Sequence, residues 1–414
     1  MRTSRSWLSG DTPDQLIGTG AAPGTPKRPA SAGILGRVAG RLTPPIWAVA
    51  VAVLAAVAWF ARVHSDLPDF EVYRTAATRA LDAEPLYRPE DGHWQFKYLP
   101  AFALAMTPFA VLPQAVARPL WYAGSVALLV VFVRRSVAAV PDKRWTDRAT
   151  AWLAVLLVGR FYVHELDLGQ TNILLGVMLV TALSAIGRGR PLRAGALVGL
   201  AVFVKPYALI LVPWLPVAAG WPAAALAAAV IAGGVVAPAA AYGWSGNLAL
   251  VGEWYRTVTQ TTAPNLLFPE NISLAAMWAK WLGPSEAAST AALVSAAALA
   301  ALAAATVWWR RRARSPACLE FGLLLMLVPL VSPQGWDYVL LIATPGFLTL
   351  ANALPRLAPV GRGALAAALA VVAFTIFDLL GRSLYMRAMD ASLLSVAVLL
   401  LVAGLVHVRR RGLG

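Results

Sequence analysis

Long runs of apolar residues constrain the fold of this 414-residue chain more than any other feature. Residues 44–63 read PPIWAVAVAVLAAVAWFARV, with one charge near the end. Several further windows exceed the roughly 18 apolar residues that a helix needs to cross the ~30 Å hydrocarbon core of a bilayer. We therefore predict an all-α fold, a polytopic membrane helical bundle with about 11–12 hydrophobic helices.

Composition agrees with this class and argues against others. Only 13% of the residues are charged, against about 25% in a soluble protein. The net charge of +15 would suggest nucleic acid in a soluble protein, but here the basic residues cluster between apolar runs, so we expect no nucleic-acid partner. The single Cys318 allows neither an intramolecular disulfide nor a thiolate metal cluster.

The basic clusters predict the topology, because cytoplasmic connections of membrane proteins carry an excess of Lys and Arg. We place the clusters and both termini on the cytoplasmic side of a bacterial cell (inner) membrane. The connections 64–98, 163–171, 244–284, 332–338 and 380–390 then face outward. The clusters are Arg37/Arg41, Arg134/Arg135 with Lys143/Arg144/Arg148, Arg188/Arg190/Arg193, Arg310/Arg311/Arg312/Arg314, Arg356/Arg362 and Arg409/Arg410/Arg411.

Two apolar stretches contain prolines that interrupt a helix. Residues 98–119 are short and Pro-broken, which predicts a re-entrant segment before a full span at 119–134. Residues 194–219 must make no net crossing, and we predict two short helices broken at Lys205-Pro206. Such a break survives at membrane depth only beside protein or a water-filled cavity.

The chain divides into three parts. Residues 1–43 are rich in Ser, Thr, Gly and Pro, which predicts a disordered cytoplasmic tail. We expect residues 409–414 to form a short basic cytoplasmic tail. Residues 44–408 form the integral-membrane domain. Its first apolar run starts too far from the N-terminus for an ordinary signal peptide, so we expect a signal anchor.

Three acids follow the first apolar run, in HSDLPDFEVYRTA at residues 64–76: Asp66, Asp69 and Glu71. The surrounding outer loop, 64–98, is too polar to span, and Phe70 to Leu81 is a helical stretch. One interpretation is a solvated loop whose acids merely keep it outside. The alternative is a site at the membrane surface, on the face where other polar motifs emerge.

Those motifs are HELDLGQTN (164–172), VKPY (204–207), PENISL (269–274) and SPQGWDY (332–338). Lys205 is a cation inside an apolar stretch, which is costly unless the group is paired, snorkels to the surface or has a function. Side-chain amides suit sugar hydroxyls because they donate and accept, although they also cap helices. Trp336 could stack on a sugar face. The predicted sugar or acceptor contacts are Gln170, Asn172, Asn271, Gln334, Trp336 and Asp337.

Taken in order, these pieces resemble glycosyltransferase family 87, which includes polyprenyl-phosphomannose-dependent mannosyltransferases. The motifs are an Asp–x–x–Val–Tyr at 69–73, FKYLPAFALAMTPFAVLP, DLGQTNILL, the stretch around VKPY, NISL and SPQGWDY, over about residues 45–380. Members tend to carry a His near the last motif, where this chain has Asp337 and Tyr338.

The resemblance implies a GT-C fold with an extracytoplasmic active site, a polyprenyl-phosphate sugar donor and inversion at the anomeric carbon. It makes the acid of the first outer loop the general base, which is Asp69 by motif position, with Asp66 as second choice. The departing phosphate needs a cation, and Lys205 can supply it as a point charge. We expect no metal and no cofactor, because DxD is missing and the four histidines are scattered.

The sequence thus predicts a hexosyltransferase that moves a mannose-like sugar to a lipid or glycan acceptor among the membrane lipids. Two other classes stay open. A broken helix with a buried Lys is also a trait of secondary transporters, although we find no internal repeat. A non-catalytic membrane assembly subunit is the second.

Overall fold

The computed structural model describes residues 53–64, 66–308 and 316–412. The tail predicted for 1–43, and residues 44–52 of the first apolar run, lie outside the described residues. Contacts divide the chain into two units, Met1–Leu54 and Ala55–Gly414, and the second contains nearly all the described residues. Its described residues form helices joined by turns; the β-structure among them is the single bridge between Asn271 and Trp336, and they contain no strand. The predicted all-α class is confirmed.

Four described helices are long and apolar enough to cross a membrane: α6 (Gln114–Ala139), α14 (Glu286–Trp308), the continuous segment Asp337–Arg356 and α19 (Leu393–Arg411). Two bent pairs, Trp221–Val236 with Ala239–Asn265 and Pro359–Phe374 with Phe377–Asp390, raise this to six if each is one span. Four shorter apolar helices complete the set, at Asn172–Gly187, Pro191–Val204, Pro206–Ala218 and Pro316–Val331. A polytopic membrane protein is confirmed, whereas the predicted count of 11–12 hydrophobic helices and the sidedness of the loops stay predictions.

Both predicted proline breaks are present. The short helices α4 (Pro100–Ala105) and α5 (Thr107–Ala110) precede the long α6. Helix α9 (Pro191–Val204) ends at Lys205, whose backbone is extended (φ −151°, ψ 123°), and the 3₁₀ helix η3 (Pro206–Trp214) follows, then α10 (Leu215–Ala218). Proline cannot donate a helical hydrogen bond and disfavours a helical residue before it, which explains why α9 stops there.

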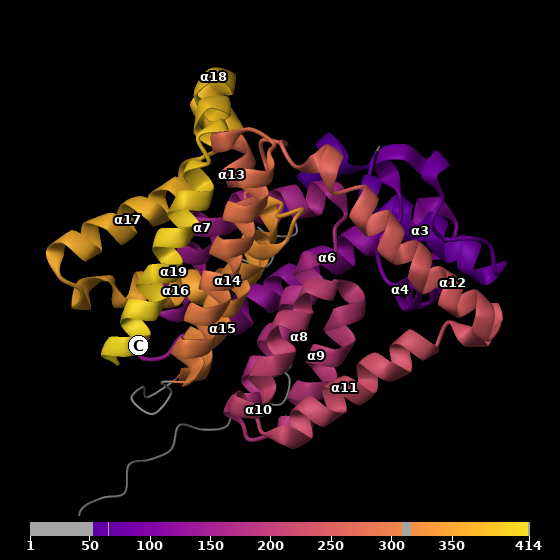
Figure 1. The fold of residues 1–414 in the computed structure, drawn as a ribbon, viewed down its shortest axis with the longest axis horizontal. Coiled ribbons are helices and arrows are strands. Elements are labelled where there is room, and N and C mark those ends of the chain that lie inside the picture. The colour runs from indigo at the N-terminus through magenta and orange to yellow at the C-terminus, as the bar shows by residue number, and fades with distance from the viewer. Residues whose placement is uncertain (1–52, 65, 309–315, 413–414) are drawn as a thin grey trace, which may run out of the picture. The chain divides into compact units, whose positions relative to one another are not determined.

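Small residues hold α9 against α11 (Trp221–Val236), and α8 (Asn172–Gly187) packs on its other side (Figure 1). A Cβ on Gly195 would lie 2.1 Å from the Ala223 carbonyl oxygen, and one on Gly199 would lie 2.9 Å from that of Ala227. This four-residue spacing of glycines lets two backbones approach closely, as in membrane helix pairs. The position of α9 in turn fixes where Lys205 stands.

The C-terminal helices pack against one another (Figure 1). Helix α15 (Pro316–Val331) lies against α16 (Thr344–Ala353), with Gly322 facing Gly346, and against α19. Helix α19 continues through Arg411, so the arginines predicted to begin a basic tail belong to its last turn. Arg409 is fully buried there and pairs with Glu320 of α15 at 3.2 Å.

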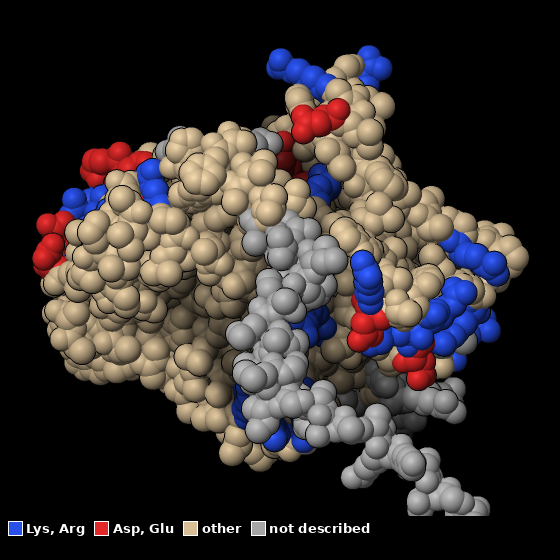
Figure 2. Space-filling view, turned by 180° about the vertical axis from the view of Figure 1, so that it is seen from behind, with Lys and Arg blue, Asp and Glu red and all other residues tan. Residues whose placement is uncertain are grey.

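Charged side chains avoid much of the surface. The face shown in Figure 2 is mostly uncharged, and its Lys, Arg, Asp and Glu side chains form small, separate groups. Exposed large apolar side chains, such as Trp152, Leu156, Leu248 and Trp308, lie on several helices. Apolar groups in this number are expected where lipid, rather than water, covers a protein.

Candidate active site

Helix α3 (Pro68–Leu81) carries the acids of the first outer loop. Pro68 occupies its first turn, where the missing backbone donor costs nothing, and Asp69 and Glu71 follow, where the helix dipole favours negative charge. Phe70, Tyr73 and three alanines form its buried face. The predicted helical stretch from Phe70 to Leu81 is confirmed, with a start two residues earlier.

The three acids have different surroundings. Asp66 is exposed. Glu71 is held by Arg118, whose Nε lies 2.6 Å from its carboxylate, and accepts a 3.2 Å hydrogen bond from Gln114. Asp69 is half-buried and faces Lys205 and Gln170. Burial raises the pKa of Asp69, while the Lys205 charge, a hydrogen bond with Gln170 and the charges of Lys97 and His164 oppose that rise.

Gln170 joins α3 to the end of α7 (Asp147–Leu168). The chain leaves α7 through Gly169, which has φ +71°, a left-handed conformation that suits glycine. The side chain of Gln170 is buried, and its Oε1 accepts hydrogen bonds from Lys205 Nζ at 3.0 Å and from one of two tyrosine hydroxyls, Tyr73 Oη at 3.1 Å or Tyr98 Oη at 3.2 Å. The two tyrosine hydroxyls are 2.6 Å apart.

Lys205 reaches this cluster from the end of α9. Its Nζ lies 4.7 Å from the centroid of the Tyr98 ring, in addition to its contact with Gln170. An ammonium over an aromatic face is stabilised by the ring's negative charge density. The cation at the proline break and the acid after the first apolar run therefore face the same amide, although they are far apart in the sequence.

Asn172 lies two residues after Gln170, at the start of α8, and is fully buried. Its side-chain amide donates to Glu165 Oε2 at 2.9 Å, and its carbonyl oxygen accepts from the Tyr207 hydroxyl. Glu165 also accepts from the backbone N–H groups of Asn172 and Ile173, so it caps α8. Both ends of the Asn172 amide are thus occupied by protein groups.

The SPQGWDY motif adds an aromatic row beside these residues. Tyr338 lies with its ring centroid 5.0 Å from that of His164, and Trp336 is parallel to Tyr338, within 7°, at 6.5 Å. Trp336 is half-exposed, whereas Asp337 is buried and pairs with Arg160 of α7 at 3.2 Å. The last motif therefore contacts α7, the helix whose C-terminal end leads into Gln170.

Asn271 and Gln334 join two loops behind this row. The Asn271 amide donates to the carbonyls of Asn265, Leu266 and Pro333, and its oxygen accepts from the backbone N–H groups of Ser273 and Gly335. Gln334 donates to Thr261 and Thr262 at 3.2 and 3.3 Å. In this structure the two amides hold the loop that carries Trp336, and their predicted contact with sugar stays a prediction.

Several cluster residues have only a weak signal in the sequence. Lys97 lies within electrostatic range of Asp69 and Lys205; burial lowers its pKa, which the Asp69 charge raises and the Lys205 charge lowers. Tyr98 follows it in FKYLP, where a cation and a tyrosine directly precede a proline-started helix. Glu165 and His164 could be suspected from HELDLGQTN, but nothing in the sequence indicates that Tyr207 reaches Asn172.

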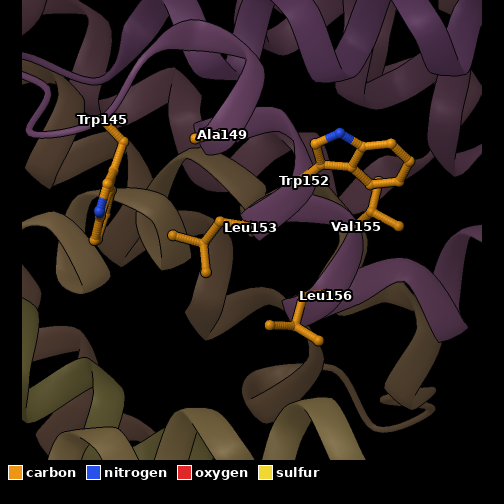
Figure 3. A pocket seen from close by; sticks show the side chains of 6 residues that line it. All are labelled: Trp145, Ala149, Trp152, Leu153, Val155 and Leu156. Atoms are coloured by element: carbon orange, nitrogen blue, oxygen red, sulfur yellow. The ribbon is translucent and has the colours of Figure 1, made fainter. Parts of the chain in front are cut away.

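Potential metal ligands and one hollow on the surface also bear on where an ion or small molecule could bind. Within it, no group of three or more His, Cys, Asp or Glu side chains could hold a metal ion. An apolar hollow of about 590 Å³ lies on the N-terminal turns of α7 and is lined by Trp145, Ala149, Trp152, Leu153, Val155 and Leu156 (Figure 3). Since a helix rises ~1.5 Å per residue, Leu156, the lining residue nearest to His164 along α7, is roughly 12 Å from it, so the hollow is separate from the polar cluster.

Comparison with known proteins gives the family. The family model for glycosyltransferase family 87 matches residues 96–333, more than half of the chain. A polyprenol-phosphate-mannose-dependent alpha-(1-2)-phosphatidylinositol mannoside mannosyltransferase of Mycolicibacterium smegmatis is 30% identical over 180 residues, 37% of this chain and 40% of that protein. No solved structure matches.

A second relative from the same organism, a polyprenol-phosphate-mannose-dependent alpha-(1-2)-phosphatidylinositol pentamannoside mannosyltransferase, is 29% identical over 213 residues, half of each chain. The chain thus spans half or less of the length of these relatives. The segment matched by the family model contains Gln170, Asn172 and Lys205, while Asp69 precedes it. The resemblance inferred from the motifs is confirmed: the chain belongs to glycosyltransferase family 87.

Proposed function

We propose that this protein is a membrane glycosyltransferase that moves a mannose-like hexose from a polyprenyl-phosphate donor to a hydroxyl of a lipid or glycan acceptor. Membership of family 87 supports the class of reaction. The two relatives are named for dependence on polyprenol-phosphate-mannose and for phosphatidylinositol mannoside acceptors, which supports the donor and a lipid-linked acceptor. The active site faces the extracytoplasmic side.

One observation carries the proposal. A half-buried carboxylate, Asp69, and a lysine ammonium, Lys205, converge on the same amide of Gln170. Transfer from a polyprenyl-phosphate sugar needs a base for the acceptor hydroxyl and a cation for the departing phosphate. The cluster offers one of each, at the ends of helices α3 and α9.

Asp69 acts as the general base. Burial raises its pKa, which strengthens it as a proton acceptor, while Lys205 and Lys97 favour its ionised form. As the acceptor oxygen forms its bond to the anomeric carbon, the hydroxyl proton passes to the carboxylate. General-base assistance of this kind contributes about 10²–10⁴-fold. Displacement with the acceptor and phosphate on opposite faces of the sugar inverts the anomeric configuration.

Lys205 binds the donor phosphate. When the bond between sugar and phosphate breaks, the polyprenyl phosphate keeps the electron pair and gains negative charge. A cation close to this oxygen stabilises the leaving group more than the intact donor, so it accelerates the reaction as well as binding substrate. Lys97 supplies a second positive charge in the same region.

The sugar lies toward the aromatic row of Trp336 and Tyr338. Trp336 is half-exposed and can present its face to a hexose, whose C–H groups pack on aromatic rings. Gln170, Asn172, Asn271, Gln334 and Asp337 remain candidates for the surrounding polar contacts, although the amides of Gln170, Asn172 and Asn271 already bind protein groups.

A charge-matched pair of variants tests the function. Polyprenyl-phosphate mannose with a phosphatidylinositol mannoside acceptor is the assay, in detergent or vesicles. Asp69→Asn keeps the shape of the side chain but cannot accept the proton, so turnover should fall about 10²-fold or more with donor binding retained. Asp66→Asn removes the charge of an exposed side chain three residues before Asp69, and its turnover should stay near that of the wild type.

Two other outcomes would change this assignment. If only Asp66→Asn loses turnover, Asp66 is the base. If both variants retain turnover, the acids belong to a solvated loop and the enzymatic role of this cluster fails. A panel of other polyprenyl-phosphate hexoses tests which sugar is transferred. Transfer of a different hexose, with no transfer of mannose, would overturn the mannose assignment.

A further inference from the structure

The carbonyl oxygen of Gln170 lies within 3.2 Å of the Lys205 ammonium and of the Tyr73 and Tyr98 hydroxyls. The two hydroxyls have one proton each and are 2.6 Å apart, so one donates to the other, and the oxygen accepts from Lys205 and from one tyrosine. A carbonyl oxygen has two lone pairs, so this one is saturated. Lys205 decides which end of the amide it is, because an ammonium donates hydrogen bonds and cannot accept one. The NH₂ end of Gln170 cannot replace the oxygen here without facing the ammonium as a second donor.

The same side chain interacts with Asp69 and favours its ionised form. Asp69 lies one helical turn before Tyr73, whose hydroxyl is 3.1 Å from the Gln170 oxygen. An ionised carboxylate only accepts, so the NH₂ end of Gln170 must serve it. We propose that Gln170 is a positioning residue for Asp69: Lys205 and the hydrogen-bonded tyrosine pair hold its carbonyl oxygen, and this directs its NH₂ group at the carboxylate. The inference rests on the proposed function only in taking Asp69 as the base. In this arrangement the Gln170 oxygen has no free lone pair that could accept a hydrogen bond from a sugar hydroxyl.

The arrangement solves a problem of opposite charges in one site. A direct ion pair between Lys205 and Asp69 would occupy the carboxylate that must accept a proton and the ammonium that must bind phosphate. With the amide between them, each charged group has a neutral partner and stays available. The other groups that interact electrostatically with Asp69 are Lys97, His164, Tyr73, Tyr98 and Tyr338.

The test removes the lock without touching Asp69 or the amide. Tyr73→Phe, Tyr98→Phe and the double variant delete hydroxyl donors on the oxygen side of Gln170. The matched control is Tyr122→Phe, whose hydroxyl donates instead to the Ala55 carbonyl at 3.1 Å. The readout is a titration of the infrared band of the protonated carboxyl, assigned to Asp69 by its loss in Asp69→Asn. This readout needs no activity.

A loosened amide can turn its oxygen toward Asp69, which disfavours the ionised carboxylate. The Asp69 titration should therefore move upward by about 0.5–1 pH unit in the double variant, the equivalent of one hydrogen bond, and not in Tyr122→Phe. In a Gln170→Leu background the tyrosine changes should produce no further shift. Circular dichroism identifies variants that fail to fold. If the double variant does not fold, the titrations of the two single variants are compared instead.

Two results would overturn the inference. One is an unmoved titration in folded tyrosine variants. The other is an equal shift in the Gln170→Leu background, which would mean that the tyrosines act on Asp69 without Gln170. Both differ from failure of the proposed function, in which Asp69→Asn keeps its turnover whatever the titration shows.

Discussion

The Nζ of Lys205 donates a 3.0 Å hydrogen bond to the Oε1 of Gln170, which joins the end of helix α9 to the turn that follows α7. Both positions exist because a helix stops, at Lys205-Pro206 in one case and at Gly169 in the other. Polar side chains at interrupted helices can point into the space that the break opens, since the backbone there no longer fills it. The two helix breaks therefore place the polar side chains of the site.

Removing the ammonium of Lys205 should weaken donor binding. Lys205→Met keeps most of the side-chain volume, and we expect at least a 10-fold loss of affinity for a polyprenyl-phosphate sugar, about the value of one charge-assisted hydrogen bond. Direct binding to labelled donor is the measurement. Lys143→Met, which removes a lysine paired with Asp147 on the surface, is the control. Unchanged affinity in Lys205→Met would leave Lys205 with a structural role only.

The pH dependence of turnover should report Asp69. Because burial raises the pKa of this carboxyl, kcat/KM should fall on the acid side at a higher pH than for an ordinary aspartate. Activity needs the ionised form, so it is retained above that pKa and lost below it. Lys205 lowers the pKa, so its removal in Lys205→Met should move the acid limb further up. An acid limb that stays in place in this variant would contradict the assignment of Asp69 as base.

The packing of α9 against α11 should be intolerant of a single methyl group. Gly195→Ala would bring a Cβ within 2.1 Å of the Ala223 carbonyl oxygen and should destabilise the protein by about 1–3 kcal/mol, with loss of activity as Lys205 shifts. Gly233→Ala, in α11, meets no atom within 4 Å and should be neutral or stabilising. Thermal unfolding in detergent compares them, and equal stability of the two variants would argue against the close contact.

Sidedness can be tested by cysteine labelling, because the only native cysteine, Cys318, is buried. Glu90 and Arg144 are exposed and lie in loops predicted to face opposite sides. An impermeant thiol reagent on intact cells should mark Glu90→Cys and spare Arg144→Cys until the membrane is opened. The reverse pattern would invert the topology and move the site to the cytoplasmic side.

The sequence alone determined the class of the fold and the places where helices stop. Apolar run length predicts membrane helices, and proline predicts the interruption after α9, because both effects act through the local backbone. Local spacing also put Asp69 and Tyr73 on one face of a helix, where both now contact Gln170. The order of the motifs was enough to identify the family.

Only the tertiary structure decided which polar groups meet. Asp66, Asp69 and Glu71 are equivalent as residue types in a polar loop, but Glu71 faces Arg118 and Asp69 faces Lys205, and this depends on how α3 packs between α6 and the end of α9. Amides such as Gln170 and Asn271 likewise look alike in a sequence. Their partners differ because each amide pairs with whatever donors and acceptors packing brings within about 3 Å, and those groups come from distant parts of the chain.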